Sequence, residues 1–173
     1  MRYVRVHGLR MACREVGRGD PIVFLHGNPT SSYLWRAVLG RVAHHGRCLA
    51  PDLVGMGVSD KLPGSGPGSY RFVEHRHYLD ALLDELGVHD RVVLVGHDWG
   101  GVLAVDWARR HPDAVRGIAY LETLVAPVSW AGPNAPDPAL FGALRGPDGE
   151  RLVLVENVFV EKVLQAGTVR RLT

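Results

Sequence analysis

One aspartate in this chain occupies a position suited to a nucleophile. Apolar residues 92–95 run directly into residues 96–100, Gly-His-Asp-Trp-Gly. This pattern predicts a strand, a sharp turn and a helix, because small residues beside the tip let the chain turn tightly. Such a nucleophile elbow would hold Asp98 exposed above the carboxyl end of a sheet. We predict that the next helix spans residues 102–111, with an amino terminus that favours negative charge near Asp98.

An aspartate at this tip suits displacement at a saturated carbon. Unlike serine, Asp98 is already ionised at neutral pH and needs no base to attack. The product of its attack is an ester that water must later cleave. Glu122, at the end of the predicted strand 115–121, can supply the acid that follows the nucleophile in chain order. The alternative is that Asp98 only caps the helix.

A second loop carries hydrogen-bond donors. Residues 26–29, His-Gly-Asn-Pro, follow an apolar run, 22–25, that predicts a strand buried on both faces. This loop can provide one backbone donor of an oxyanion hole, the other being the N–H after the nucleophile. Asn28 and Trp99 each offer a side-chain N–H without a full charge, which suits a leaving anion such as halide. A turn with no chemical role, and core packing of Trp99, are the alternatives.

The elements around these loops alternate between strands and helices. This alternation predicts an α/β fold with a mostly parallel sheet and helices on both faces. From residue 125 prolines punctuate the chain, so we expect a sheet-forming part over 1–124 and the start of a helical lid over 125–173. The further expected elements are a hairpin (3–7 and 11–16, turned at Gly8), helices (34–42, 73–86, 139–144 and 150–164) and a strand (48–51).

Composition favours one soluble domain in a reducing compartment. The 173 residues are 46% hydrophobic and 22% charged, which is ordinary for a globular protein. The net charge of +2 and the scattered basic residues give no reason to expect nucleic acid as a partner. Cys13 and Cys48 lack metal-type spacing, and neither an apolar leader nor a bilayer-length apolar run is present. We therefore expect a cytoplasmic protein without a membrane partner.

Two further patterns could suggest a cofactor or a metal. The loop 52–61 has only two of the three glycines of a phosphate-binding loop and no helix directly after it. The pairs His44 with His45 and His75 with His77 lack a carboxylate at helical spacing, so a solvated face is the favoured interpretation. We therefore expect neither a cofactor nor a metal.

One combined pattern is carried by residues 26–36, 52–61, 96–101 and 156–161 and by Glu122. In this combination the segments resemble the haloalkane dehalogenases of the α/β-hydrolase superfamily. The resemblance implies an α/β-hydrolase fold, a halogenated alkane and water as substrates, and alcohol and halide as products. It implies that Asp98 is the nucleophile and Glu122 the catalytic acid. It further implies that Asn28 and Trp99 form the halide-binding pair.

Two related enzyme classes share part of this pattern. Epoxide hydrolases share Gly-His-Asp-Trp-Gly, but they usually have a bulky aromatic residue where Asn28 stands. They also use lid tyrosines, and no tyrosine follows Tyr120 in this sequence. The coelenterazine luciferases related to the dehalogenases share Asn28, Trp99 and Glu122, so a luciferase-like oxygenase stays open.

The catalytic histidine of the family has no counterpart in these residues. All nine histidines lie at or before His111, whereas the family's base follows the lid and two further strands. His97 is a poor substitute, because its side chain and that of Asp98 should point apart at the corner. We expect an N-terminal part of a dehalogenase, truncated within the cap, whose Asp98 ester persists. The strand before Glu122 would be an open edge for self-association or a complementing C-terminal segment. An inactive fragment or half of a split enzyme is the alternative.

Overall fold

The computed structural model describes residues 1–126 and 137–168. Its contacts divide the chain into two compact units, Met1–Val125 and Ala126–Thr173. This division falls one residue beyond the expected boundary at residue 124. The residues of both loops and Glu122 belong to the first unit.

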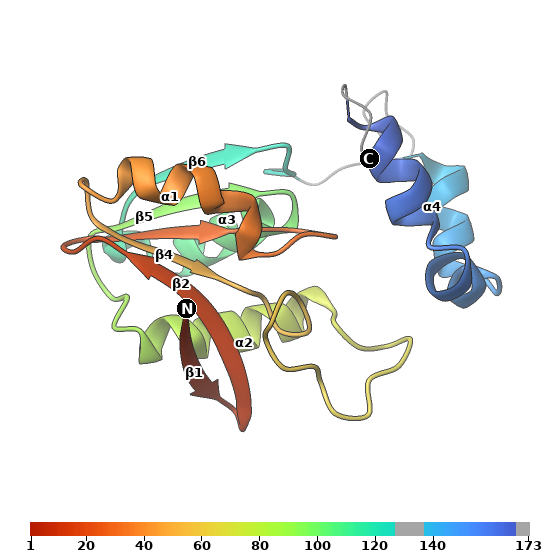
Figure 1. Ribbon diagram of the computed structural model, residues 1–173, viewed down its shortest axis with the longest axis horizontal. Helices are drawn as coiled ribbons and strands as arrows, with labels where there is room; N and C mark the ends of the chain where they lie inside the picture. The colour runs from red at the N-terminus through yellow and green to blue at the C-terminus, as the bar shows by residue number, and fades with distance from the viewer. Residues whose placement is uncertain (127–136, 169–173) are drawn as a thin grey trace. The chain divides into compact units, whose positions relative to one another are not determined.

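The first unit contains a six-stranded sheet of order β1-β2-β4-β3-β5-β6 (Figure 1). The first two strands form the predicted antiparallel hairpin, and β2 is also antiparallel to β4. The other pairings, β4 with β3, β3 with β5, and β5 with β6, are parallel, which confirms the mostly parallel sheet. The strands are β1 (Arg2–Val6), β2 (Leu9–Val16), β3 (Pro21–Leu25), β4 (Arg47–Pro51), β5 (Val92–His97) and β6 (Val115–Leu121).

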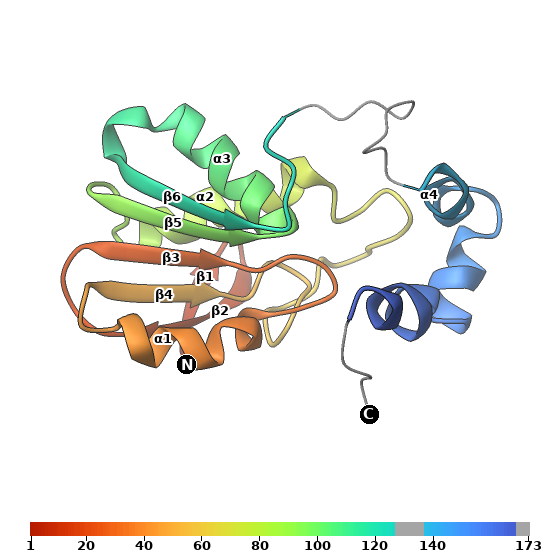
Figure 2. The same cartoon turned by 90° about the horizontal axis from the view of Figure 1, so that it is seen from above.

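Helices cover both faces of this sheet, as expected (Figure 2). On one face, α1 (Arg36–Val42) and a preceding 3-10 turn, η1 (Ser32–Trp35), pack with side chains from β3 and β4. On the other face, α2 (Phe72–Glu85) and α3 (Trp99–Arg110) contribute leucines to the main core. Helices therefore pack against both faces of the sheet, and the loops at its carboxyl ends extend from this packed core.

The predicted start of α3 at residue 102 is wrong. The helix begins at Trp99, immediately after Asp98, and ends at Arg110. The two glycines after Trp99 are helical residues, whereas the sequence pattern suggested that they belong to the turn. Gly100 is required by packing, because a Cβ there would lie 2.5 Å from the carbonyl oxygen of His26. The helix therefore approaches the loop after β3 more closely than any side chain at position 100 would allow.

The second unit is helical where it is described. Helix α4 (Pro138–Arg145) begins at Asp137, whose side chain accepts hydrogen bonds from the next turn. The single helical pattern expected over 150–164 is instead two π-helical turns, η3 (Arg151–Val155) and η4 (Phe159–Leu164). Asn157, at φ 49°, lies between them and interrupts the helix. Most of the expected proline-rich loop lies outside the described residues.

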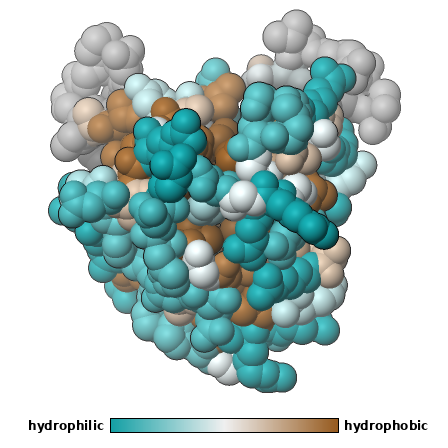
Figure 3. Space-filling view, turned by 90° about the vertical axis from the view of Figure 1, so that its left-hand side faces the viewer, coloured by the Kyte–Doolittle hydropathy of each residue, from teal (hydrophilic) through white to brown (hydrophobic). Residues whose placement is uncertain are grey.

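The amino ends of the parallel strands form a mainly hydrophilic face (Figure 3). A short 3-10 turn, η2 (Pro112–Ala114), connects α3 to β6 at this end. No helix in the described ranges 1–126 and 137–168 has the length and apolarity to cross a membrane. The residues considered for chemistry follow the opposite, carboxyl ends of β3, β5 and β6.

Candidate active site

Asp98 sits at the tip of a strained turn between β5 and α3. Its backbone angles, φ 53° and ψ −128°, lie in a region that residues other than glycine rarely adopt. Four hydrogen bonds hold this backbone, one of them a 3.4 Å bond from the Val102 N–H to the Asp98 carbonyl. Its N–H donates to the Leu121 carbonyl at 3.3 Å, and its own carbonyl accepts from the Gly101 N–H at 2.9 Å and from the Thr123 hydroxyl at 2.6 Å. The neighbouring strand β6 thus helps to keep the strained tip in place.

The side chain of Asp98 does not cap the helix. Although Asp98 occupies the N-cap position of α3, it forms no side-chain capping hydrogen bond. Its Oδ1 atom instead accepts the backbone N–H of Asn28 at 2.8 Å. The alternative of a purely capping aspartate is therefore wrong, and the predicted backbone donor of the loop after β3 does reach the carboxylate.

Gly27 makes this approach possible. A Cβ atom at position 27 would lie 2.6 Å from the Cβ of Asp98 and 2.7 Å from its Cγ, and closer still to Oδ1. No residue with a side chain fits there unless the carboxylate moves. The Gly27 position therefore sets the contact between the two loops.

The buried side chain of His26 connects the same loop to residue 53. The Leu53 N–H donates to Nε2 of His26 at 3.0 Å, so Nδ1 must carry the ring proton and donate it to the Gly27 carbonyl at 2.9 Å. Burial lowers the pKa of His26 below its ordinary value of 6.5, while the nearby carboxylates of Asp52 and Asp98 oppose this shift. The imidazole is thus held neutral in one tautomer.

The glycine-rich loop 52–61 closes on its own first residue. The buried carboxylate of Asp52 accepts the Ser32 N–H at 2.7 Å through Oδ1 and the Val58 N–H at 2.9 Å through Oδ2. It therefore connects this loop to the turn that follows residues 26–29. The sequence analysis missed these roles of His26 and Asp52. The available signal was their position, since each directly follows a buried strand.

Glu122 lies beside the elbow at the carboxyl end of β6. Both of its chain neighbours, Leu121 and Thr123, bond to the backbone of Asp98. The Glu122 side chain is exposed, its φ is 48°, and it has no hydrogen-bond partner among the described residues. The structure therefore brings this carboxylate to the elbow without engaging it.

The side chains of Asn28 and Trp99 both stand at this edge. Trp99 is the first residue of α3 and is 47% exposed, with its ring centroid 6.4 Å from that of Phe72. Asn28 is also exposed. Within residues 1–126 and 137–168, neither the Asn28 amide nor the Trp99 indole N–H has a hydrogen-bond acceptor, so both donors are open to an anion.

The other histidines do not gather around a metal. His75 is half-buried on α2, so the expected solvated face is wrong for this residue, whereas His77 is exposed and stacks on His7 at 4.0 Å. Nδ1 of His75 and Nδ1 of His97 are buried without a partner in the described part of the chain. That part contains no group of three side chains able to hold a metal ion.

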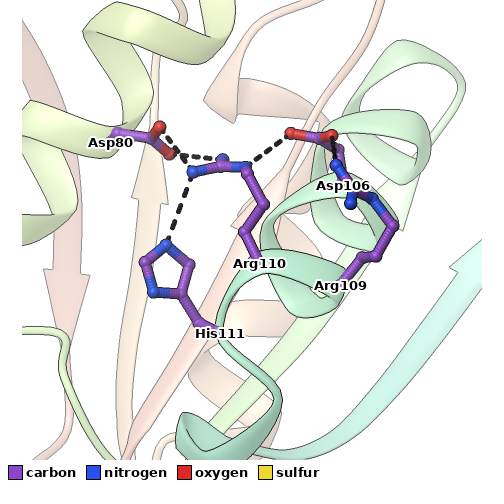
Figure 4. Close-up of polar contacts among 5 residues, drawn as sticks. All are labelled: Asp80, Asp106, Arg109, Arg110 and His111. Atoms are coloured by element: carbon purple, nitrogen blue, oxygen red, sulfur yellow. Dashed lines mark hydrogen bonds and ion pairs between the residues drawn. The ribbon is translucent and has the colours of Figure 1, made fainter.

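A polar network fixes the far end of α3 (Figure 4). Arg110 donates two hydrogen bonds of 2.8 Å to Asp80 on α2 and one of 2.9 Å to Asp106 one turn earlier. A planar guanidinium suits such paired contacts with a carboxylate. This network joins α2 to α3, whose opposite end carries the elbow.

Comparisons with known proteins give consistent results. A haloalkane dehalogenase from Sphingobium indicum (strain B90A) is 54% identical over 172 residues, which are 99% of this chain and 58% of that protein. A haloalkane dehalogenase from Mycolicibacterium smegmatis is 51% identical over 175 residues, covering 100% of this chain and 56% of that protein. The chain thus spans somewhat more than half the length of these curated relatives.

Solved structures and a family model agree on the fold. The haloalkane dehalogenase DbeA from Bradyrhizobium elkani superposes with a TM-score of 0.88 at 44% identity, over 99% of this chain and 59% of that one. The haloalkane dehalogenase DatA from Agrobacterium tumefaciens gives 0.87 at 37% identity, over 99% and 58%. The family model described as the alpha/beta hydrolase fold matches residues 20–170. The chain therefore belongs to the α/β-hydrolase fold family.

Proposed function

We propose that this chain carries the nucleophilic half of a haloalkane dehalogenase-type hydrolase. In this reaction an oxygen of the Asp98 carboxylate attacks the halogen-bearing carbon, the carbon–halogen bond breaks, and halide leaves with the bonding electron pair. The observation that supports it best is the contact between the Asn28 N–H and Oδ1 of Asp98. It holds one carboxylate oxygen, while Oδ2 has no hydrogen-bond partner among the described residues and can attack.

The leaving halide would be bound by side chains at the same edge. The Asn28 amide and the Trp99 indole N–H are neutral donors on exposed side chains. Neutral donors stabilise a departing anion without the permanent charge that would hold it after the reaction. The dehalogenase names of the relatives support this substrate class, a halogenated alkane.

Hydrolysis of the ester requires a base that activates water. The resemblance to haloalkane dehalogenases implies that this base is a late histidine, oriented by Glu122. All nine histidines of this chain precede Glu122, and in the described residues none of them forms a hydrogen bond or ion pair with the Asp98 carboxylate. We therefore expect the alkyl ester on Asp98 to accumulate in these 173 residues rather than turn over. The unit Ala126–Thr173 would be the start of the helical cap of the longer enzyme.

Intact-mass spectrometry tests the first step directly. The folded protein is incubated with 1,2-dibromoethane, and both protein mass and released bromide are followed. We expect one bromoethyl group per chain and an equal amount of bromide, with neither in Asp98→Ala. A parallel incubation with styrene oxide checks the epoxide hydrolase alternative, because an adduct only with the epoxide would favour that class. Folded protein that forms no adduct, or an adduct that survives in Asp98→Ala, would overturn the proposal.

The open edge of the sheet is the second part of this proposal. Strand β6 ends the sheet, and Ile118, Tyr120 and Leu121 on it are 38%, 53% and 51% exposed. An unpaired strand with apolar side chains is a template for another strand. We propose that a complementing C-terminal segment pairs here, and that copies of the chain associate through this edge when it is absent.

Two measurements separate these occupants of the β6 edge. Size-exclusion chromatography with light scattering should show oligomers of the chain alone, and a stable monomer would refute self-association. Addition of the C-terminal remainder of the Sphingobium indicum relative should convert the oligomers to a one-to-one complex. This complex should hydrolyse 1,2-dibromoethane and release the alcohol. Failure to form that complex would refute complementation.

The two cysteines bear on the compartment of the protein. Cys13 and Cys48 are free and buried, which supports a reducing compartment, and we propose a cytoplasmic location.

A further inference from the structure

The donor to Asp98 belongs to a peptide unit that is held on its other side. A trans peptide is planar, so the carbonyl of one residue and the N–H of the next point in opposite directions. The Gly27 carbonyl and the Asn28 N–H form such a unit, since the only cis peptide among the described residues is Asn28–Pro29. Fixing the carbonyl direction therefore fixes the direction of the N–H.

Three donors converge on the Gly27 carbonyl. The Nδ1–H of His26 lies 2.9 Å away, and the Thr30 N–H and the Thr30 hydroxyl each lie 3.0 Å away. Most peptide carbonyls in a loop bond to one partner or to water, so this one is unusually constrained. His26 is itself fixed by the Leu53 N–H on its opposite ring nitrogen.

We propose that His26 and Thr30 are positioning residues, which aim the Asn28 N–H at Asp98 by holding the opposite side of the same peptide plane. Neither side chain bonds to the carboxylate, so both act through the Gly27–Asn28 peptide. Rotation of this plane would weaken the 2.8 Å bond to Oδ1 and leave the carboxylate free to reorient. The consequence for the rate of ester formation rests on the proposed function, whereas the orientation of the Asn28 N–H does not.

The hydroxyl of Thr30 allows a conservative test. Thr30→Val keeps the shape and the backbone N–H but removes one of the three donors, and Thr30→Ser restores it. Ser31→Ala is the matched control. It removes the neighbouring hydroxyl, which accepts the Tyr33 N–H at 3.3 Å and does not contact Gly27. Thermal unfolding confirms that each variant is folded, and Thr30→Ala replaces Thr30→Val if the valine variant is not.

The first readout is the amide resonance of Asn28 in a nitrogen–proton correlation spectrum of the 19.0 kDa chain. An N–H that donates to a carboxylate resonates downfield. Thr30→Val should move the Asn28 resonance upfield. Thr30→Ser and Ser31→Ala should retain the wild-type resonance.

The second readout is single-turnover formation of the bromoethyl adduct. Thr30→Val should lower the limiting rate at saturating bromoalkane by roughly three- to tenfold, the effect of one weakened hydrogen bond, and leave the half-saturating concentration unchanged. Thr30→Ser should recover the rate. An unchanged Asn28 resonance in Thr30→Val would overturn the positioning role. A wild-type protein without adduct would refute the proposed function alone, because the Asn28 resonance still reports the positioning.

Discussion

Replacing Gly27 with alanine is the most direct perturbation of the contact between the two loops. The added methyl group would lie 2.6 Å from Cβ and 2.7 Å from Cγ of Asp98, well inside van der Waals contact, so the carboxylate must move. Its bond to the Asn28 N–H would then be lost or lengthened. A displacement of a reacting group by about 1 Å can lower the reaction rate by about 10²-fold. Overpacking at a filled position costs about 1–3 kcal/mol of stability.

Two measurements and a matched glycine check this prediction. Adduct formation with 1,2-dibromoethane should slow by roughly two orders of magnitude in Gly27→Ala, and the melting temperature should fall by roughly 2–12 °C. Gly40 in α1 is the control, because a Cβ there meets no atom within 4 Å. Gly40→Ala should raise stability by about 1 kcal/mol, as alanine favours the helix, and leave the rate unchanged.

One result would refute the reasoning. If Gly27→Ala formed the adduct at the wild-type rate and remained fully folded, the contact between residues 27 and 98 would not control the nucleophile. Slow adduct formation with unchanged stability would still support control of the carboxylate by this contact, since the carboxylate could then move without strain elsewhere.

Three further predictions concern other parts of the first unit. Burial lowers the pKa of His26 in the folded protein below 6.5, its ordinary value in the unfolded chain. Between these two pKa values the unfolded chain binds more protons than the folded protein, so the free energy of unfolding should fall as the pH drops from 6.5 toward the folded pKa. Urea titrations at several pH values should show a smaller loss in His26→Asn, and an equal loss would contradict this assignment. Arg110→Met should lower stability by about 1–3 kcal/mol, since Asp80 loses its donor and Asp106 keeps only the 3.4 Å bond from Arg109. Adduct formation should stay unchanged, and slower adduct formation would show that the network affects the elbow. Burial raises the pKa of Cys13 to about 12, so iodoacetamide should modify this thiol only in unfolded protein, and rapid labelling of the native chain would be inconsistent with its burial.

Residue types and their spacing were enough to predict the strands of the sheet, the helices on its two faces and the location of the elbow. Continuous apolar runs predicted β3 and β5, and β6 was predicted with its observed bounds, Val115–Leu121. Residue types also gave the candidate chemistry, because an aspartate between a strand and small residues is a poor choice for packing. The helix start at Trp99 was missed, since glycines that serve close packing look the same in a sequence as glycines that serve a turn.

The way in which the loops meet depends on contacts between residues that are distant in the sequence. The bond between Asn28 and Asp98 joins residues 70 positions apart, and no local pattern encodes the orientation of a single peptide plane. The tautomer of His26, the occupied carboxylate of Asp52 and the placement of Glu122 through its neighbours likewise depend on contacts between separate strands. Sequence periodicity specifies which face of an element is buried, whereas a hydrogen bond depends on the position and direction of two groups. Those are set when the parallel strands pair and bring their carboxyl ends together.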